Sequence, residues 1–515
     1  MNQTTSRREF LADVGRGMLV ASLGAAVSSE LGLARVFADD AGTLNFGTLE
    51  PLVAMMQETP IAKFLPALAA KLKEGTELRT LIAAGALANA RSFGGQDYTG
   101  YHALMALMPA FDMSKQLSGI EGALPVFKVL YRNTNRIQEA GGRKNEVLHQ
   151  IIAAEMAREQ ATGETLLDAE HKGDMAAAEG IFARMLSGPE GEAFNHLQFA
   201  VQDEVDVHRV VLAWRSWALL DVAGKENALT LLRQSLRYCV NQEKYLRDNK
   251  MSPSPIRALV PKLFDQYKLE SQPLGTKPAD DALVAQLTEI IYGIDRAKAA
   301  DAVAAALADG ISPEGVGEAI SLAANQLVLR DPGLAKNNGP KRPMGSVHGA
   351  SVGVHASDSA NAWRHIARVS NPRNTYASLI VGAFHTAGQS AGLNAKPYPL
   401  AENLEKIEAK DSATLLKDLD AAIKEKDQAR ASALVQRYGE QGHPERAVLD
   451  VMIKYAVSED GALHAEKFYR TVEEEFAATR AAFRWRHVCA LARVTASEYG
   501  FPAAGYAEAR TLLGA

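Results

Sequence analysis

The fold class is decided by residues 281–308, which read DALVAQLTEIIYGIDRAKAADAVAAALA. This stretch is rich in Ala and Leu, with Glu, Lys and Arg among them, and these are strong helix formers. Its apolar residues recur at intervals of three and four, the spacing of one helix face. Residues 67–89, 194–222 and 463–499 repeat the pattern, and long strand-like alternations are absent from the sequence. The sequence therefore predicts an all-α fold.

The first residues carry the three parts of a signal peptide in order. A basic, polar segment contains Ser6-Arg7-Arg8-Glu9-Phe10-Leu11, an apolar segment follows at 18–27, and Val36-Phe37-Ala38 offers a small-residue cleavage site. The apolar segment is shorter than the roughly 20 residues that a membrane-spanning helix needs. We therefore expect residues 1–38 to be a twin-arginine signal peptide. The twin-arginine translocase would then export the protein folded, and it would be periplasmic or secreted without a stable membrane span.

Composition limits the partners and the covalent framework. The net charge is −5 and no basic stripe is present, which argues against nucleic acid as a partner because phosphate binding needs concentrated positive charge. Cys239 and Cys489 are the only cysteines. One bridge between them is an alternative, but two separate buried thiols fit a chain with so few cysteines better.

A Pro-rich stretch at 251–278 marks the main boundary of the chain. We expect a first helical half at 39–255, a connector at 256–279 and a second helical half at 280–515. The two sides resemble each other at four places in the same order. These pairs are Leu72-Lys73-Glu74-Gly75 with Leu307-Ala308-Asp309-Gly310, Tyr101-His102-Ala103 with Val347-His348-Gly349, Leu167-Asp168-Ala169 and Asp174 with Leu419-Asp420-Ala421 and Asp427, and Phe199 to Glu204 and His208 with Tyr455 to Asp460 and His464.

These matches predict a large helical array built from two diverged halves related by a pseudo-two-fold axis. A plainer explanation is that Ala-rich helices resemble one another anyway. It accounts for the matched Ala and Leu residues, but it does not account for the aligned histidines and acidic residues.

The matched histidines are accompanied by carboxylates. Glu204 and His208 are four residues apart, as are Asp460 and His464, and residues four apart share a helix face. Such a pair can ligate Fe, Cu or Zn with the carboxylate as a co-ligand, or it can orient an imidazole as a general base. A surface ion pair or a packed core histidine is the alternative for each position. The predicted metal ligands are His102, His208, His348, His464, Glu204 and Asp460.

Three further features complete the candidates. Arg215, Trp214 and Trp217 follow His208 by one to two helical turns, so Arg215 is a candidate cofactor-binding residue, whereas the Trp pair suits helix packing better. Glu146 and His149 have the Glu-x-x-His spacing of di-iron bundles, but no second copy of that motif exists in the sequence. Nucleotide-binding glycine loops and haem-attachment motifs are also absent from it.

The segment from His348 to Ala356 reads His-Gly, five residues, His-Ala. It resembles the corresponding stretch of questin oxidase-like proteins, an all-helical family named for fungal enzymes that cleave an anthraquinone ring oxidatively in Baeyer–Villiger fashion. Asp460, His464 and Lys467, followed by residues 484–491, resemble the C-terminal helix of the family, and His102 matches an N-terminal histidine. Ser357-Asp358 departs from the family, which has a basic residue after His-Ala.

The resemblance implies an oxidoreductase that acts on an aromatic or polyketide-like small molecule in a His-lined pocket between helices. The residues of this chain that match the motif histidines of the family are His348, His355, His464 and His102. The resemblance also makes Lys467 a candidate cofactor-binding residue. Together with His208, these histidines form the predicted catalytic set. The alternative is a non-catalytic helical-repeat protein that binds a partner. Convergent histidines favour the first function, whereas dispersed histidines and an exposed apolar groove favour the second.

Overall fold

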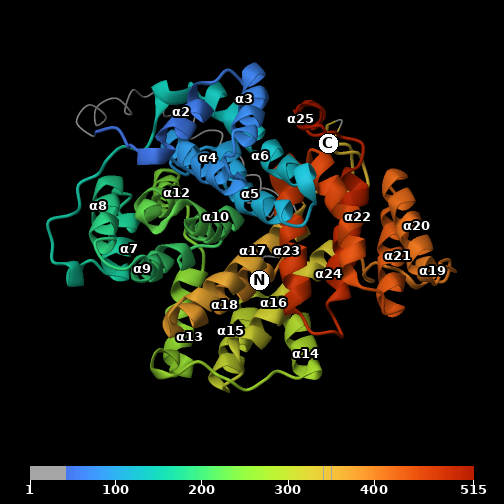
Figure 1. Cartoon of the computed structure of the whole chain (residues 1–515). Helices are drawn as coiled ribbons and strands as arrows, with labels where there is room; N and C mark the ends of the chain where they lie inside the picture. Colours follow the sequence, from blue (N-terminus) through green and yellow to red (C-terminus); the bar gives the residue numbers. More distant parts are fainter. Residues whose placement is uncertain (1–41, 340, 350) are drawn as a thin grey trace. The chain divides into compact units, whose positions relative to one another are not determined.

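The computed structural model describes residues 42–339, 341–349 and 351–515. Within these ranges the chain forms α-helices joined by short 3₁₀ turns and loops, and its β-structure is limited to isolated bridges (Figure 1). The all-α prediction is therefore confirmed for this part of the chain. The predicted leader at 1–38 lies outside the described residues.

The chain divides into two compact units. Of the described residues, unit 1 holds 42–261, 369–374 and 507–515, and unit 2 holds 262–368 and 375–506. The division after Pro261 falls inside the stretch at 256–279 for which a connector was expected. The first half of that stretch is not a loop, because helix α13 spans Ile256–Tyr267.

Unit 1 is built around helices that are buried on nearly every side. Residues 81–93 of α4 are all buried, which explains why this helix carries small and apolar residues around most of its circumference. Helix α4 packs against α2, α5 and α6, and α12 packs against α7, α8, α9 and α10. The helices of this part of the chain are α2 (Glu50–Glu58), α3 (Ile61–Lys73), α4 (Leu78–Phe93), α5 (Tyr98–Ser114), α6 (Ala123–Glu139), α7 (Gly163–His171), α8 (Met175–Met185), α9 (Glu190–Gln202), α10 (Val207–Ala218), α11 (Leu220–Ala223) and α12 (Ala228–Asp248), with α25 (Tyr506–Leu513) near the C-terminus.

Unit 2 has a comparable centre. Residues 315–329 of α16 are all buried, and α16 packs against α14, α15 and α24. Helix α24 also packs against α20, α21, α22 and α23. The helices of this part are α14 (Asp281–Tyr292), α15 (Arg296–Ala308), α16 (Pro313–Leu329), α17 (Val352–Val369), α18 (Pro372–Thr386), α19 (Ala401–Leu404), α20 (Ser412–Lys424), α21 (Gln428–Glu440), α22 (Glu445–Ser458), α23 (His464–Ala478) and α24 (Trp485–Glu498).

Side-chain caps divide the helical stretches of the sequence. Residues 281–308 form two helices, because the Asp295 carboxylate accepts a hydrogen bond from the backbone N–H of Lys298 and begins α15. In the same way Asp206 accepts from the N–H groups of His208 and Arg209 and begins α10. Each carboxylate satisfies N–H groups that have no partner within the first helical turn.

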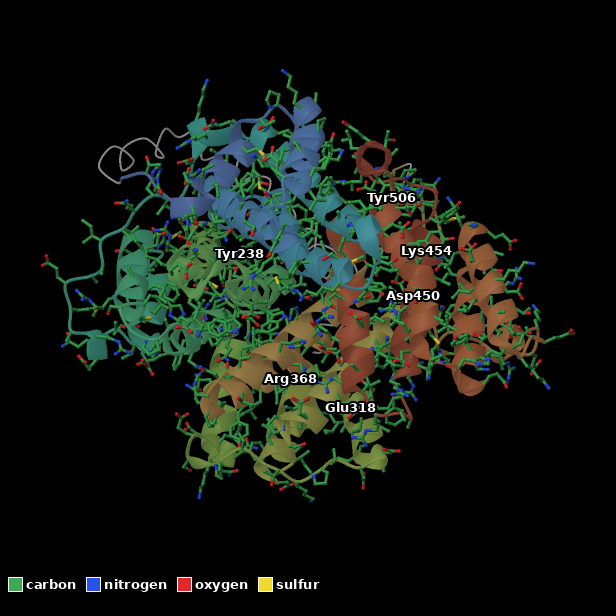
Figure 2. The ribbon with its side chains drawn as sticks, viewed as in Figure 1. Tyr238, Glu318, Arg368, Asp450, Lys454 and Tyr506 are labelled. Carbon is green, nitrogen blue, oxygen red and sulfur yellow. The ribbon has the colours of Figure 1, made fainter. Side chains whose placement is uncertain are left out.

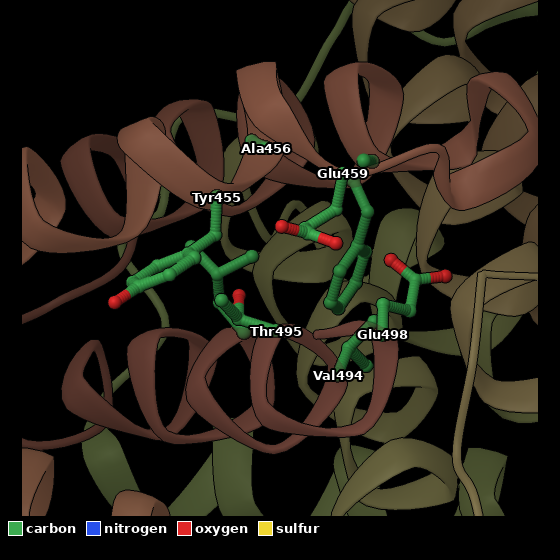
Figure 3. Close-up of a pocket in the computed structure, with 9 residues that line it drawn as sticks. Tyr455, Ala456, Glu459, Val494, Thr495 and Glu498 are labelled. Atoms are coloured by element: carbon green, nitrogen blue, oxygen red, sulfur yellow. The ribbon is translucent and has the colours of Figure 1, made fainter. Parts of the chain in front are cut away.

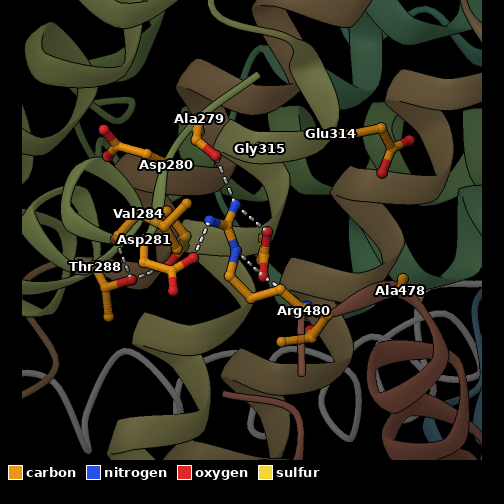
Figure 4. A network of polar contacts seen from close by, with 12 residues as sticks. Ala279, Asp280, Asp281, Val284, Thr288, Glu314, Gly315, Ala478 and Arg480 are labelled. Carbon is orange, nitrogen blue, oxygen red and sulfur yellow. Dashed lines mark hydrogen bonds and ion pairs between the residues drawn. The ribbon is translucent and has the colours of Figure 1, made fainter. Parts of the chain in front are cut away.

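Arg480, which follows α23, joins three elements of unit 2 (Figure 4). Its guanidinium donates to both carboxylate oxygens of Glu318 on α16, at 2.9 and 3.0 Å, and to Oδ1 of Asp281 at 2.7 Å. It also donates to the carbonyl of Ala279 at 3.0 Å. A planar guanidinium suits such a set of acceptors, so this residue fixes the C-terminal end of α23 against α14 and α16.

We find no helix in the described ranges that has both the length and the apolar composition needed to cross a membrane.

Candidate functional site

Two of the predicted histidines meet in unit 2. His355 lies near the start of α17 and His464 is the first residue of α23, and their Nε2 atoms are 3.1 Å apart. The rings are almost perpendicular, at 83°, with centroids 5.0 Å apart. Only 8% of His355 and 2% of His464 is exposed. Two imidazoles thus meet in the buried interior of unit 2, although 109 residues separate them in the sequence.

An unusual backbone leads into His464. Gly461, Ala462 and Leu463 have φ angles of 47°, 49° and 66°, in the left-handed region that Ala and Leu rarely adopt. This conformation allows Nδ1 of His464 to lie 3.1 Å from the carbonyl oxygen of Ala462. Because a carbonyl only accepts, Nδ1 carries the proton and Nε2 offers its lone pair in the neutral ring. Strain of this kind recurs at functional sites.

The His-Gly part of the motif lies against the same histidine. A Cβ atom on Gly349 would be 2.3 Å from Cβ of His464, so only glycine fits at this position. The backbone N–H of Gly349 donates to Oε1 of Glu498 at 2.7 Å, and that of Val347 donates to Oγ of Ser497 at 2.8 Å. Two bonds from α24 thereby hold the loop in place.

His348 is buried in that loop and precedes α17 rather than belonging to it. Burial, and then the positive charge of Arg342, lower the pKa of His348 to about 4. The ring is therefore neutral at pH 7. His348 and His355 therefore share no helix face, because α17 begins only at Val352.

A polar seam continues from the histidine pair along α17 and α23. Thr471 donates to Oδ1 of Asp358 at 3.0 Å, and Asn361 donates to Oε1 of Glu475 at 2.9 Å. Arg364 pairs with Oε2 of Glu475 at 2.6 Å. Contacts that advance together along both helices mean that α17 and α23 run in the same direction. The seam fixes their register and so places His355 opposite His464.

Glu475 stays ionised inside this seam. Burial by itself would raise the pKa of its carboxyl group, but the Arg364 guanidinium, His487 and the hydrogen bonds from Ser321 and Asn361 lower it to about 2. His487 shows the opposite effect of burial, which lowers the pKa of its ring to about 4. A buried carboxylate with a buried partner cation holds its place rigidly, because losing either charge would leave the other unpaired.

A small cavity lies beside the start of α23 (Figure 3). It is lined by Glu459 at the end of α22, Ala465 on α23, and Glu498 on α24, among others. Its volume is about 20 Å³, which is room for roughly one water molecule. The cavity can therefore hold water or a comparably small molecule between α22, α23 and α24.

Unit 1 contains a second pair, formed by His102 on α5 and His208 on α10. Their ring centroids are 4.9 Å apart at an angle of 61°. Tyr101 lies 5.1 Å from each of them, and Tyr98 lies 4.3 Å from His102. Tyr238 of α12, labelled in Figure 2, meets the Tyr101 ring edge to face at 5.6 Å. This pair therefore lies among phenol rings.

Asp206 organises the second pair. Its Oδ1 accepts a hydrogen bond from the Tyr238 hydroxyl at 2.8 Å and lies 3.5 Å from Nδ1 of His208. Burial would raise the pKa of Asp206, but His208 and the hydrogen bonds from His208, Tyr238 and Arg209 hold it well below its usual range. Burial, and then the Asp206 charge, raise the pKa of Tyr238, so this phenol stays neutral.

The predicted carboxylate partners do not share helix faces with the histidines. Helix α9 ends at Gln202 and α10 begins at Val207, and Glu204 between them accepts from the backbone N–H of Ser254 at 2.7 Å. Helix α22 ends at Ser458, and Asp460 pairs with Lys341 at 2.5 Å. Both predictions of an acid and an imidazole on one helix face are therefore wrong, because a helix boundary falls between each acid and its histidine.

The two candidate cofactor-binding residues are both buried. Arg215 lies on α10 and is 4% exposed, and Lys467 lies on α23, three residues after His464, and is 2% exposed. Trp217 stacks on Phe194 at 4.4 Å, which agrees with a role in packing. Cys239 and Cys489 are free and buried, and burial raises the pKa of both thiols, that of Cys489 to about 12. Two separate buried thiols were expected.

Glu146 and His149 lie in a segment without a helix, where Glu146 pairs with Arg91 at 3.0 Å. The Glu-x-x-His spacing needs a helix to bring its two residues together. The spacing therefore does not place these two side chains on one helix face.

Sequence reasoning missed Asp206, Asp358 and Glu475. Asp206 comes just before an amphipathic helix, where an N-cap was predictable. Asp358 follows His355 by three residues, and Glu475 follows His464 by eleven, which are about one and three helical turns. Each acid therefore lies on the same helix face as its histidine, and this spacing could have identified both acids from the sequence.

Comparison of the chain with protein-family models, curated proteins and solved structures gives no match.

Proposed function

We propose that this protein is an exported oxidoreductase that acts on an aromatic or polyketide-like small molecule, with the His355–His464 pair at its reacting centre. The observation that carries the proposal is the convergence of motif residues in unit 2. His355 meets His464 at 3.1 Å, and Gly349 lies against the His464 side chain so closely that no other residue fits. These are residues on which the resemblance to questin oxidase-like proteins rests.

The pair has the chemistry that such a function needs. An imidazole accepts or donates a proton near neutral pH, and two imidazoles in contact can pass one proton between them. Both rings are buried, so bulk water does not compete for that proton. His348, neutral because of its low pKa, supplies a third imidazole in the adjoining loop.

An oxygen-incorporation assay tests this function. The purified chain is incubated under ¹⁸O₂ with a hydroxyanthraquinone as the probe and ascorbate as the reductant, and the products are analysed by mass spectrometry. We expect product with one ¹⁸O atom from the wild type and from His443→Ala, which alters a histidine that bonds to the Lys410 carbonyl outside the pair. His355→Ala and His464→Ala should lose the product.

The same assay decides between an enzyme and a helical scaffold. Turnover that survives in both pair variants would remove the histidines from the chemistry. Absence of turnover with hydroxyanthraquinones, hydroxynaphthoquinones and simple phenols would contradict the proposal and leave the non-catalytic binding protein as the better reading.

We also propose that the two units are diverged copies of one ancestral repeat. What supports this is the order of helices, α4, α5, α7 to α10 and α12 in unit 1 against α16, α17, α20 to α23 and α24 in unit 2. Asp174 and Asp427 cap α8 and α21 at corresponding places. In this proposal His208 corresponds to His464.

The counterpart of His102 in this proposal is His355 rather than His348. His102 and His355 each lie near the start of a helix and each follows a glycine by two residues, Gly100 and Gly353. Both glycines touch the helix before their own, since a Cβ would meet Phe93 of α4 or the Val328 backbone of α16. A crystal structure tests the idea: the units should superpose helix by helix, with His102 on His355. A different helix order would contradict it.

Export is the last part of the proposal. We expect the full chain expressed in its bacterial host to reach the periplasm, and Arg7→Lys with Arg8→Lys to keep it in the cytoplasm. Cell fractionation followed by immunoblotting measures this. Equal export of the double variant would exclude the twin-arginine route.

A further inference from the structure

We propose that His355 and His464 bind a transition-metal ion through their Nε2 atoms. The inference deepens the proposed function by naming the cofactor class of its site, and it rests on that function only for the role of the ion. Metal binding itself is measured without any turnover.

The distance between the nitrogens suits two ligands of one ion. With metal–nitrogen bonds of about 2.1 Å, nitrogens 3.1 Å apart subtend an angle of about 95° at the metal. That value lies between the octahedral and tetrahedral angles. Imidazole ligands at such an angle suit Zn, Cu and Fe.

The surroundings of His464 match those of a metal ligand. Histidines that bind metals almost always donate their other ring N–H to a carboxylate, a carbonyl or water, which fixes the tautomer and the ring orientation. Nδ1 of His464 lies 3.1 Å from the Ala462 carbonyl oxygen. The left-handed turn at residues 461–463 presents this carbonyl to the ring, which gives a reason for the strain at Ala462 and Leu463.

The alternative is a direct hydrogen bond between the two rings, and the two arrangements require different tautomers. Because Nε2 of His464 carries only a lone pair, a hydrogen bond needs the proton on Nε2 of His355. Metal binding needs that proton on Nδ1 of His355, so that both Nε2 lone pairs face the ion. The tautomer of His355 therefore separates the two cases without any substitution.

The first experiment uses the full chain after removal of metal with a chelator. Co²⁺ is titrated in and followed through its visible d–d absorption. A parallel sample is loaded with diamagnetic Zn²⁺, and its ¹⁵N-histidine spectra record the ring tautomers. We expect both ions to bind, and the nitrogen signal of His355 Nε2 in the Zn²⁺ sample to become that of a bound, unprotonated nitrogen. Retention of a proton on His355 Nε2 at saturating Zn²⁺ would overturn the proposal in favour of the hydrogen bond.

Variants then assign the ligands. We expect His355→Ala and His464→Ala each to weaken Co²⁺ binding by at least about 100-fold, and Gly349→Ala, which displaces the His464 ring, by about 10-fold or more. His443→Ala is the matched control and should bind as the wild type does. Circular dichroism confirms that each variant is folded, and the tautomer measurement on the wild type stands if one is not.

The outcome is separable from that of the oxygen-incorporation assay. Binding that depends on His355 and His464 in a protein without oxidase activity would uphold the metal site and refute the proposed function. Unchanged Co²⁺ affinity in both folded variants would refute the metal site alone. His348→Ala completes the series within unit 2, because the sequence also predicts this residue as a ligand, and an unchanged Co²⁺ affinity would limit the imidazole ligands of this unit to the pair.

Discussion

Nε2 of His355 lies 3.1 Å from Nε2 of His464, across a sequence separation of 109 residues. The contact is the first of a series along α17 and α23 that continues through Asp358 with Thr471 and through Arg364 with Glu475. Any change that shifts one of these helices along the other therefore shifts the imidazoles as well.

Gly349→Ala should destabilise the protein by about 1–3 kcal/mol, the range for overpacking a filled site. The added methyl group would start 2.3 Å from Cβ of His464, so the ring or the loop must move. Chemical denaturation measures the change. Gly191→Ala on α9 is the control, because the nearest atom there is 4.0 Å away and the helix tolerates alanine. If both variants are equally stable, the loop that contains Gly349 moves to accommodate the added methyl group without loss of stability.

Glu475→Gln should cost about 3–5 kcal/mol of unfolding free energy, because it leaves the buried guanidinium of Arg364 without its carboxylate. Glu440→Gln, which removes a surface pair with Arg437, should cost less than about 1 kcal/mol. Urea denaturation compares the two. A small effect at Glu475 would mean that Arg364 finds sufficient compensation in Glu314 and the Ala478 carbonyl.

Acid should destabilise the fold through His487. Burial lowers the pKa of this ring to about 4, below its usual 6.5, so the unfolded chain binds a proton that the folded chain refuses. The free energy of unfolding therefore falls as the pH drops from about 6.5 to 4, by about 3 kcal/mol from this group. His487→Gln should remove that part of the pH dependence. If the unfolding free energies of the wild type and the variant fall equally between pH 7 and pH 4, His487 is not the source of this pH dependence.

Asp206→Ala should be more costly than loss of a helix cap alone. Asp206 caps α10, accepts from the Tyr238 hydroxyl and lies beside His208, whereas Asp174 caps α8 at an exposed position. We expect about 1 kcal/mol for Asp174→Ala, and about 1–3 kcal/mol more for Asp206→Ala because a buried hydroxyl loses its acceptor. Thermal denaturation measures both. If both variants lose the same unfolding free energy, Asp206 contributes to stability only as the cap of α10.

The helical fold was predictable because it depends on local patterns. Spacings of three and four in residues 281–308 identify a helix face without knowledge of its partner, and Asp295 marks a helix start by its own chemistry. The same local logic failed between Glu204 and His208. There Asp206 capped a new helix, and a spacing of four lost its meaning because the chain is not helical across it.

The sequence by itself determined the helical class, the glycine and histidine composition of the His348–Ala356 motif, and the choice of His355 and His464 as candidates. Tertiary structure decided that these two histidines meet, that Asp460 instead pairs with Lys341, and that Glu475 remains charged. The physical reason is that helix propensity and capping act within a few residues. The meeting of His355 with His464 depends instead on the register of α17 against α23, which buried polar contacts more than a hundred residues apart establish.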